Sequence, residues 1–204
     1  MTYSELIEHF VQRGTLRTPA IIEAFRQVSR EDFLPAEVRA FAGEDHPFCI
    51  GHGQTNSQPY TVALMLEMLQ PGSGQRILDV GCGSGWTTAL LAHIVGAGGQ
   101  VTGTEIIAEL AQLAAARCRD ENVHIIHTPS GIGCSDQAPY DRILVSAAAS
   151  RLPDTLLEQL SAEGTLVIPI GHSIYRFEKH AGNITQSEFP GFSFVPLIEG
   201  DTNP

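Results

Sequence analysis

Basic residues are few in this 204-residue chain: 12 lysines and arginines stand against 23 aspartates and glutamates, which gives a net charge of −11. Nucleic acid and anionic membranes attract proteins through positive charge, so this deficit excludes both as expected partners. Peptides and small cationic ligands remain compatible with it. Apolar runs are short, and none approaches the roughly 18 residues that a membrane-spanning helix needs.

Cysteine is also scarce, and Cys49, Cys82, Cys118 and Cys134 are scattered along the chain. They form no CxxC pair, so neither a disulfide framework nor a zinc site is indicated, and we interpret them as reduced thiols of an intracellular protein. The start, MTYSELIEHF, lacks the basic segment and apolar core of a signal peptide. We therefore expect a cytoplasmic location.

Two common catalytic patterns are missing. The eight histidines contain no HExxH motif, and His124 and His127 lie three apart in an expected strand, where their side chains would point to opposite faces. No metal site is therefore expected. No GxSxG elbow occurs and Ser57 has no evident histidine partner, which argues against hydrolysis through an acyl-enzyme.

The rest of the composition is that of a folded domain, with 43% hydrophobic and 17% charged residues. A chain of this length can bury one well-formed core. We expect a single domain over residues 1–204. Its expected parts are N-terminal helices and a polar loop (1–59), an α/β core (60–171) and C-terminal antiparallel strands (172–204).

The N-terminal part opens with two amphipathic helices. The first covers residues 4–13 and stops at Gly14. The second begins with Thr18 as N-cap and Pro19 at the first helical position. A loop over residues 44–58 then leads into the core.

From residue 60 onward, short apolar strands alternate with helices, a pattern typical of βαβ units and a parallel sheet. Strands such as RILDV and RILVS are apolar throughout, which fits burial on both faces. The expected strands span residues 75–81, 100–106, 122–128, 141–149 and 164–171, and the expected helices span 61–70, 86–96, 107–120 and 153–160. After residue 171 the pattern predicts an antiparallel hairpin turning near residues 182–183, and one last strand. The predicted fold is a doubly wound, mostly parallel α/β sheet of Rossmann-like type with an antiparallel C-terminal edge and N-terminal helices.

The strongest local signal is ILDVGCGSGW, in which Gly81, Gly83 and Gly85 recur between a strand and a helix. Glycines at such a turn supply unusual backbone dihedrals and let a ligand approach closely, although they could also form only a tight turn. A dinucleotide fingerprint would place its third glycine where this chain has Trp86, whose side chain is too large for that packing.

Acidic residues at two strand ends favour a different cofactor. Asp79, just before the glycines, suits a positively charged ligand such as a sulfonium or amino group. Glu105 follows the glycine loop by about twenty residues, where a carboxylate accepts hydrogen bonds from ribose hydroxyls. The combination favours S-adenosylmethionine over NAD, and leaves a NAD-dependent dehydrogenase as a distant alternative.

A second polar loop, GHGQTNSQPY, precedes the helix expected from residue 61. In one interpretation, Asn56 and Ser57 ahead of Pro59 cap that helix. In the other, the loop binds a substrate carboxylate. A carboxylate is already an anion at neutral pH and needs no general base, but it does need hydroxyl and backbone N–H donors that align it. The residue types of this loop supply such donors.

These segments carry a family resemblance. LDVGCGSG, TGTEI, APYDRILVSAAAS, LPDTLLEQL and GTLVIPIG follow one another as in class I methyltransferases, and IGHGQTNSQPY with the closing FVPL resembles the protein-L-isoaspartate O-methyltransferase family. The resemblance runs from about Thr18 to Leu197. It implies that S-adenosylmethionine is the cofactor and S-adenosylhomocysteine the product. It also implies methylation of the stray carboxyl group of isoaspartyl residues in damaged proteins or peptides, which starts their repair, by an enzyme that acts as a monomer.

The resemblance also implies roles for individual residues. Ser57 matches the family's active-site serine, and Thr55 is expected to hold the substrate carboxylate with it. The expected substrate contacts are Gly53, Gln54, Asn56 and Gln58. The expected cofactor contacts are Asp79, Gly81, Cys82, Gly83, Gly85, Glu105, Ser130 and Gly131. We interpret Cys82 as a small packing residue near the cofactor, although its position at a helix N-terminus could lower the pKa of its thiol.

Two positions depart from the family pattern. Asn56 stands where an isoleucine or similar residue is usual, and could add a hydrogen bond to substrate or alter which acid fits. Residues 129–131 read Pro-Ser-Gly in place of Gly-Asp-Gly, and loss of one adenine hydrogen bond typically costs about 1 kcal/mol, roughly five- to tenfold in affinity. Two alternatives follow: a methyltransferase of the same fold acting on another carboxyl or hydroxyl group, and a cofactor- or isoaspartate-binding relative without turnover.

Overall fold

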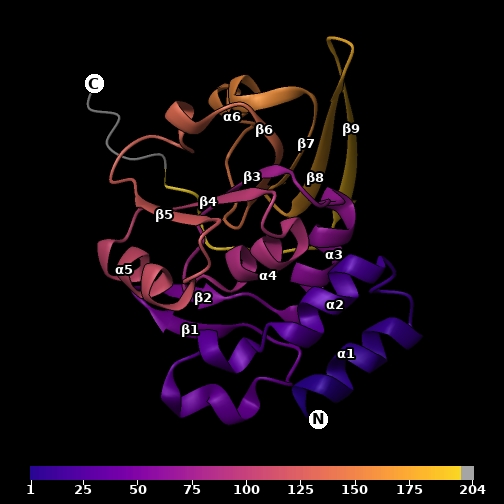
Figure 1. Cartoon of the computed structure of the whole chain (residues 1–204), viewed down its shortest axis with the longest axis vertical. Helices are drawn as coiled ribbons and strands as arrows, with labels where there is room; N and C mark the ends of the chain where they lie inside the picture. Colours follow the sequence, from indigo (N-terminus) through magenta and orange to yellow (C-terminus); the bar gives the residue numbers. More distant parts are fainter. Residues whose placement is uncertain (199–204) are drawn as a thin grey trace.

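A seven-stranded sheet in the order β5-β4-β3-β6-β7-β8-β9 forms the centre of the computed structural model, which describes residues 1–198 (Figure 1). β3 to β7 pair in parallel, and β8 and β9 add an antiparallel edge. This confirms the predicted sheet. Its strands are β3 (Arg76–Val80), β4 (Gln100–Glu105), β5 (Val123–His127), β6 (Tyr140–Val145), β7 (Leu160–Ile170), β8 (Ser173–His180) and β9 (Asn183–Pro190).

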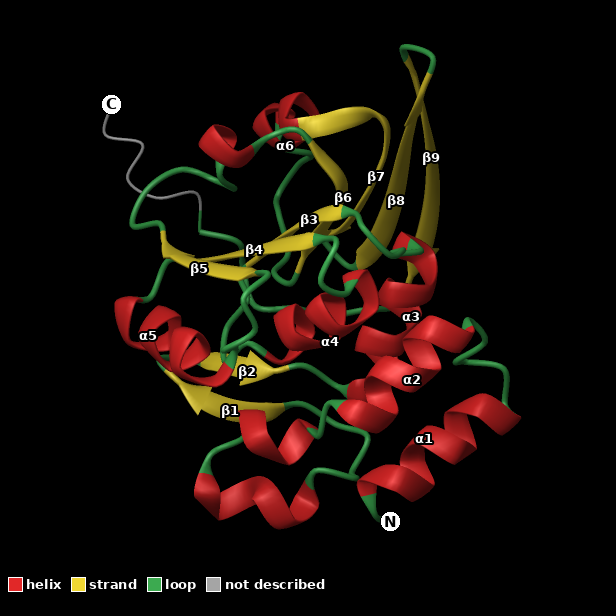
Figure 2. Ribbon diagram, in the orientation of Figure 1, coloured by secondary structure: helices red, strands yellow, loops and turns green. Residues whose placement is uncertain are grey.

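Helices cover both faces of the sheet. α3 (Pro59–Leu69), α4 (Trp86–Val95) and α5 (Ala108–Arg117) lie on one face, and α6 (Asp154–Gln159) lies on the other (Figure 2). α1 (Tyr3–Gln12) and α2 (Pro19–Gln27) form an outer layer, in which α2 packs on α4. α3 and α4 are therefore enclosed between the sheet and this layer, which explains why most of their residues are buried. The short 3-10 helices are η1 (Arg30–Phe33), η2 (Ala36–Phe41) and η3 (Ser135–Gln137).

The apolar core joins the N-terminal layer to the sheet. One cluster of buried side chains extends from Leu6 in α1 through Trp86 in α4 to Ile174 in β8. A second cluster fills the space beneath α6 and includes Leu78, Ile143 and Leu166 from three neighbouring strands. None of the helices within residues 1–198 has both the length and the hydropathy needed to cross a membrane.

The loop expected over residues 44–58 contains a small hairpin that the sequence analysis missed. β1 (Phe48–Gly51) pairs antiparallel with β2 (Gln54–Asn56), and the turn between them places His52 and Gly53 at positive φ, 53° and 72°. Strands of three and four residues are too short to show a side-chain period, which is why the pattern was not recognised.

Three of the strand predictions were wrong. β6 ends at Val145, because Ala148 and Ala149 form only isolated bridges with Pro196 and Ile170. β7 begins at residue 160, directly after α6, four residues earlier than expected. The expected last strand is not found among residues 191–198, where the chain contributes a single bridge; residues 199–204 lie outside the described part.

Candidate functional site

A cavity lies at the carboxyl ends of β3, β4 and β6, the edge at which sheets of this kind bind ligands. It brings together the two loops that the sequence analysis singled out, together with the chain that follows β5 and the segment after β9. Its wall consists of residues 54–57, 62, 80–84, 86–87, 104–106, 128, 131–133, 146–147 and 195–198.

The glycine loop after β3 forms one side of the cavity. Gly81 has a φ of 74°, and a Cβ added there would meet no atom within 4 Å, so the backbone is open to a ligand at this point. Gly83, with a φ of 54°, donates its N–H to Glu105 Oε2 over 2.8 Å. The loop is thereby fixed to the end of the neighbouring strand.

Gly85 packs against α5 and is not among the residues that line the cavity, so its predicted cofactor contact is not supported. Its φ is 95°, and an added Cβ would lie 2.8 Å from the Cys118 Sγ and 3.3 Å from Ala114 in α5. The Cys118 thiol also donates a hydrogen bond to the Gly85 carbonyl. A glycine is needed here because α4 begins against α5 with no room for a side chain.

Glu105 lies on the cavity wall at the end of β4 and is 5% exposed. Besides the bond from Gly83, its Oε1 accepts the N–H of Ile107 over 3.0 Å. A carboxylate has about four acceptor positions, so two remain for donors in the cavity. This remaining acceptor capacity suits the two hydroxyls of a ribose.

Asp79 is not among the residues that line the cavity, so the structure gives no support to its predicted direct contact with a cofactor. The side chain is fully buried beneath the glycine loop, where Thr88 of α4 donates to its Oδ2 over 2.6 Å. Its other oxygen has no partner among residues 1–198. Burial, and to a lesser extent the charge of Glu105, raise the pKa of Asp79 to about 7.

Cys82 lies on the wall, as expected for a residue near a cofactor. Its pKa shifts in the opposite direction from the one a helix N-terminus would impose. Burial raises it well above the ordinary value, and the nearby Asp79 and Glu105 raise it further. The thiol is therefore neutral, which agrees with a packing role.

The segment after β5 forms the opposite wall. Gly131 lines it, whereas Ser130 is exposed and lies outside it, so the predicted Ser130 contact is not supported. The sequence analysis missed Thr128, which adds a hydroxyl on the wall, and the apolar Ile132. Gln159 of α6 holds this segment, donating to the Ile132 carbonyl over 3.1 Å and accepting from the Cys134 N–H over 2.8 Å.

Thr55 and Ser57 lie between two hollows. Both line the cavity, and both line an adjoining surface hollow formed by Pro47, Gln58, Thr61, Ser146, Ser193, Phe194 and Val195. Of the other predicted substrate contacts, Gln54 lines the cavity and Gln58 the adjoining hollow, whereas Gly53 lies in the β1–β2 turn and lines neither.

Neither Asn56 nor Ser57 caps α3. The N-cap position is Gln58, which makes no capping bond, and Asp45 instead accepts the N–H of Tyr60 through its Oδ1 over 2.8 Å. Gln58 in turn donates to the backbone carbonyl and to the carboxylate of Asp45. The Ser57 hydroxyl has no hydrogen-bond partner among residues 1–198 and remains available to a ligand.

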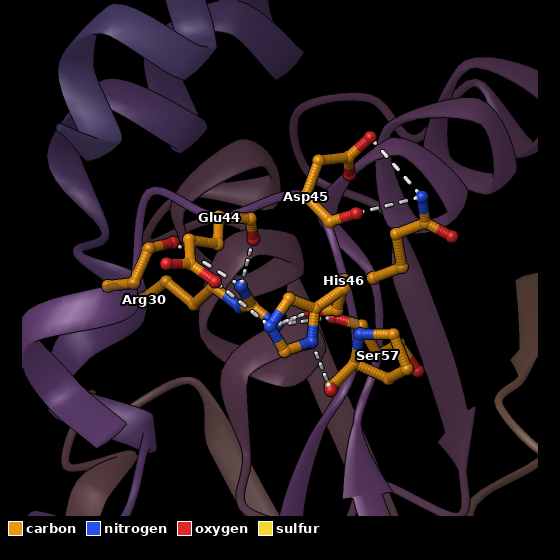
Figure 3. Close-up of polar contacts among 8 residues, drawn as sticks. Arg30, Glu44, Asp45, His46 and Ser57 are labelled. Carbon is orange, nitrogen blue, oxygen red and sulfur yellow. Dashed lines mark hydrogen bonds and ion pairs between the residues drawn. The ribbon is translucent and has the colours of Figure 1, made fainter. Parts of the chain in front are cut away.

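Arg30, which the sequence analysis also missed, holds this loop in place from inside the protein. Its side chain is fully buried, and Figure 3 shows its guanidinium among Glu44, His46 and Ser57. All five N–H groups are used: Nε donates to the Asn56 side chain over 2.8 Å, and the two terminal nitrogens donate to the carbonyls of Ala42, Glu44, His46 and Ser57 over 2.8 to 3.3 Å.

The charge of Arg30 is stabilised without a carboxylate in contact. Its guanidinium lies 5.0 Å from the ring centroid of Phe48 and 5.3 Å from that of Trp86, which provides cation–π attraction. Burial lowers the pKa of Arg30 to about 10, so the group remains a cation at neutral pH.

The amide of Asn56 is used within the protein on both sides. Its Oδ1 accepts from Arg30, and its Nδ2 donates to the Ser84 Oγ over 3.3 Å. The side chain is only 5% exposed. Asn56 lines the cavity, but the suggested hydrogen bond to substrate is not supported, because both atoms of its amide are already paired within the protein.

Comparison with known proteins decides the family. The sequence profile of the protein-L-isoaspartate(D-aspartate) O-methyltransferases matches residues 1–202. The chain belongs to this family. It is 39% identical over 210 aligned residues to the protein-L-isoaspartate O-methyltransferase of Methanopyrus kandleri, covering 98% of this chain and 93% of that protein. It is 45% identical to the Methanothrix thermoacetophila enzyme, covering 87% of each chain.

A solved structure of the family agrees with the fold. A protein-L-isoaspartate O-methyltransferase of Plasmodium falciparum, in complex with S-adenosyl-L-homocysteine, matches with a TM-score of 0.86 and 27% sequence identity. The match covers 98% of this chain and all of the other. The predicted family and fold class are thus both confirmed.

Proposed function

We propose that this protein transfers a methyl group from S-adenosylmethionine to the free carboxylate of L-isoaspartyl residues in damaged proteins or peptides, the first step of their repair. The observation that carries the proposal is the position of Thr55 and Ser57. Their hydroxyls lie where the cavity beside the glycine loop adjoins a surface hollow. Family membership and the names of the relatives support the same activity.

The cavity fits the cofactor in the residue types that line it. Glu105 has acceptor capacity left for ribose hydroxyls, and the backbone at Gly81 is open to a ligand. Cys82, Gly83 and Gly131 complete the predicted contacts that lie on the wall, and Thr128 and Ile132 join them. When bound, S-adenosylmethionine supplies an electrophilic methyl group for transfer to a nucleophilic oxygen.

The chain's own contribution is to hold the acceptor carboxylate. The carboxylate is ionised at neutral pH and needs no base, so a neutral hydroxyl can hold one oxygen while the other stays nucleophilic. Ser57 and Thr55 supply such hydroxyls, and the adjoining hollow offers Gln58 and Phe194 to the rest of the peptide. The cation of Arg30 is buried and fully bonded, so it does not compete for the substrate anion.

Methyl transfer to a matched pair of peptides tests the proposal. Labelled S-adenosylmethionine is supplied with one peptide made with either isoaspartate or ordinary aspartate. Label on the isoaspartyl peptide alone is the expected result. Binding of S-adenosylhomocysteine without label on either peptide would instead support a relative without turnover, and label on a different acceptor would support a shifted substrate.

We also propose that the protein acts as a single catalytic unit and as a monomer in the cytoplasm, with neither nucleic acid nor membrane as partner. The net charge of −11 and four free thiols support this setting. One buried cluster contains residues of the N-terminal, central and C-terminal parts, which supports one folding unit. Sedimentation at micromolar concentration tests the oligomeric state, and a mass of two chains would contradict it.

A further inference from the structure

One side chain connects the two loops of the site. Asn56 belongs to the loop that carries Thr55 and Ser57, and its Nδ2 donates to the hydroxyl of Ser84 in the glycine loop. Ser84 is 2% exposed and lies on the cavity wall. This hydrogen bond joins residues 28 apart in sequence, and both of its partners are almost fully buried.

The connection continues on both sides of Asn56. On the cofactor side, Ser84 follows Gly83, whose N–H is held by Glu105. On the substrate side, Asn56 accepts from Arg30, and the same guanidinium donates to the carbonyl of Ser57 over 3.0 Å. A continuous set of hydrogen bonds and backbone therefore leads from the end of β4 to Ser57.

The residue type at position 56 matters to this connection. A side chain with two polar atoms is needed to pair with both Arg30 and the Ser84 hydroxyl, whereas an apolar side chain would leave the buried Arg30 Nε–H without its partner. An unpaired buried donor is costly, so the loop strongly prefers the arrangement in which Arg30, Asn56 and Ser84 all keep their hydrogen bonds.

We propose that Asn56 couples the cofactor cavity to the substrate loop, so that filling the cavity orders residues 51–58 and presents Ser57 to the substrate. The inference rests on the proposed function, because it takes the nucleoside cofactor as the ligand of the glycine loop. Coupling of this kind is reciprocal: a bound peptide must tighten cofactor binding by the same factor. Asn56 is thus a positioning residue that touches neither reacting atom.

Hydrogen–deuterium exchange tests the coupling without using catalysis. The probe is S-adenosylhomocysteine, with its binding verified by calorimetry, and the readout is amide exchange in residues 51–58. We expect bound probe to slow exchange of this segment about fivefold in the wild-type chain, the effect of one typical hydrogen bond. Ser84→Ala removes the hydrogen bond from Asn56 to Ser84 and leaves the contact of Asn56 with Arg30. The exchange ratio, which is the rate without probe divided by the rate with probe, is therefore expected to fall towards one in this variant.

Two further variants sharpen the test. Ser173→Ala removes another buried serine hydrogen bond, the one to Glu188 at 2.7 Å in the C-terminal hairpin, and is expected to keep the wild-type ratio. Asn56→Asp still accepts from Arg30 and can accept from the Ser84 hydroxyl, so it is expected to retain most of the coupling. Asn56→Leu removes both bonds and is expected to abolish it.

The outcomes separate this inference from the proposed function. An unchanged exchange ratio in Ser84→Ala, or no protection of residues 51–58 in the wild-type chain, overturns the coupling even if the isoaspartyl peptide is methylated. Protection that is lost only in Ser84→Ala and Asn56→Leu supports the coupling even if no peptide is methylated. Failure of S-adenosylhomocysteine to bind overturns both.

Discussion

The carboxylate of Asp45 accepts the backbone N–H of Tyr60 over 2.8 Å, so α3 is capped by a residue fifteen positions upstream. The same residue holds the side chain of Gln58. Capping from a distance frees the intervening residues from that task. Ser57 can therefore line the two hollows without also capping α3.

Asp45→Ala is expected to lower the free energy of unfolding by about 1 kcal/mol, the usual cost of losing a helix cap. Urea unfolding measures it. Asp45→Asn keeps an oxygen acceptor for the Tyr60 N–H and is expected to recover most of the loss. Equal destabilisation by both variants would show that the charge of Asp45, and not its capping bond, is what matters.

Ser57→Ala is expected to reduce kcat/KM for an isoaspartyl peptide roughly ten- to a hundredfold, because a donor aligned with the reacting carboxylate is lost. Its stability should stay within about 0.5 kcal/mol of the wild type, since the hydroxyl has no partner among residues 1–198. Steady-state kinetics and urea unfolding of the same preparation give the two values. Unchanged kinetics would remove Ser57 from the catalytic assignment.

Arg30→Lys keeps the charge but supplies at most three donors where five are used, so at least two acceptors lose their partner. We expect the free energy of unfolding to fall by roughly 2–4 kcal/mol. The matched control is Arg26→Lys, whose ion pair with Glu8 is exposed and should contribute less than about 1 kcal/mol. Similar losses in the two variants would contradict the role of Arg30.

Alanine at two glycines of one loop is expected to have different effects. Gly85→Ala places a Cβ 2.8 Å from the Cys118 Sγ at a φ of 95°, and should destabilise the fold by roughly 2–4 kcal/mol. Gly81→Ala meets no atom and should cost only about 1–2 kcal/mol of backbone strain, while its methyl group lowers S-adenosylhomocysteine affinity about tenfold. Thermal unfolding and calorimetry distinguish them. A greater affinity loss in Gly85→Ala would reverse the assignment.

The buried Asp79 predicts a pH-dependent stability. Its pKa is raised from 3.8 to about 7 on folding, so the folded state binds more protons between these values, and this group's contribution to stability falls as pH rises through that window. Asp79→Asn removes the titration. Relative to wild type, the free energy of unfolding of the variant should increase by roughly 2–4 kcal/mol between pH 4 and pH 8.

Urea unfolding of wild type and Asp79→Asn at several pH values measures that difference. A constant offset reports how well the amide fits beside Thr88, and the slope alone reports the titration. A difference that does not change with pH would mean that Asp79 stays ionised on folding, against the raised pKa.

The pattern of apolar residues was sufficient to predict the βαβ sheet and its antiparallel edge. The parallel strands were recognisable because a strand that is buried on both faces is a continuous apolar run. The family motifs likewise placed Thr55, Ser57 and Glu105 on the cavity wall. The residue types of a short segment are enough to predict strands and motif loops, since each of these depends on residues that are adjacent in the chain.

The tertiary structure decided what depends on distant residues. Asp79 and Gly85 look like ligand contacts in the glycine motif, yet α4 and α5 enclose them. Arg30 carries no motif, and its five acceptors come from residues 42–57, which only folding gathers around one guanidinium. The sequence by itself determined the sheet, the family and the two loops. Which side chains of those loops line the cavity and which hold the loops in place was decided by packing, because burial depends on neighbours far away along the chain.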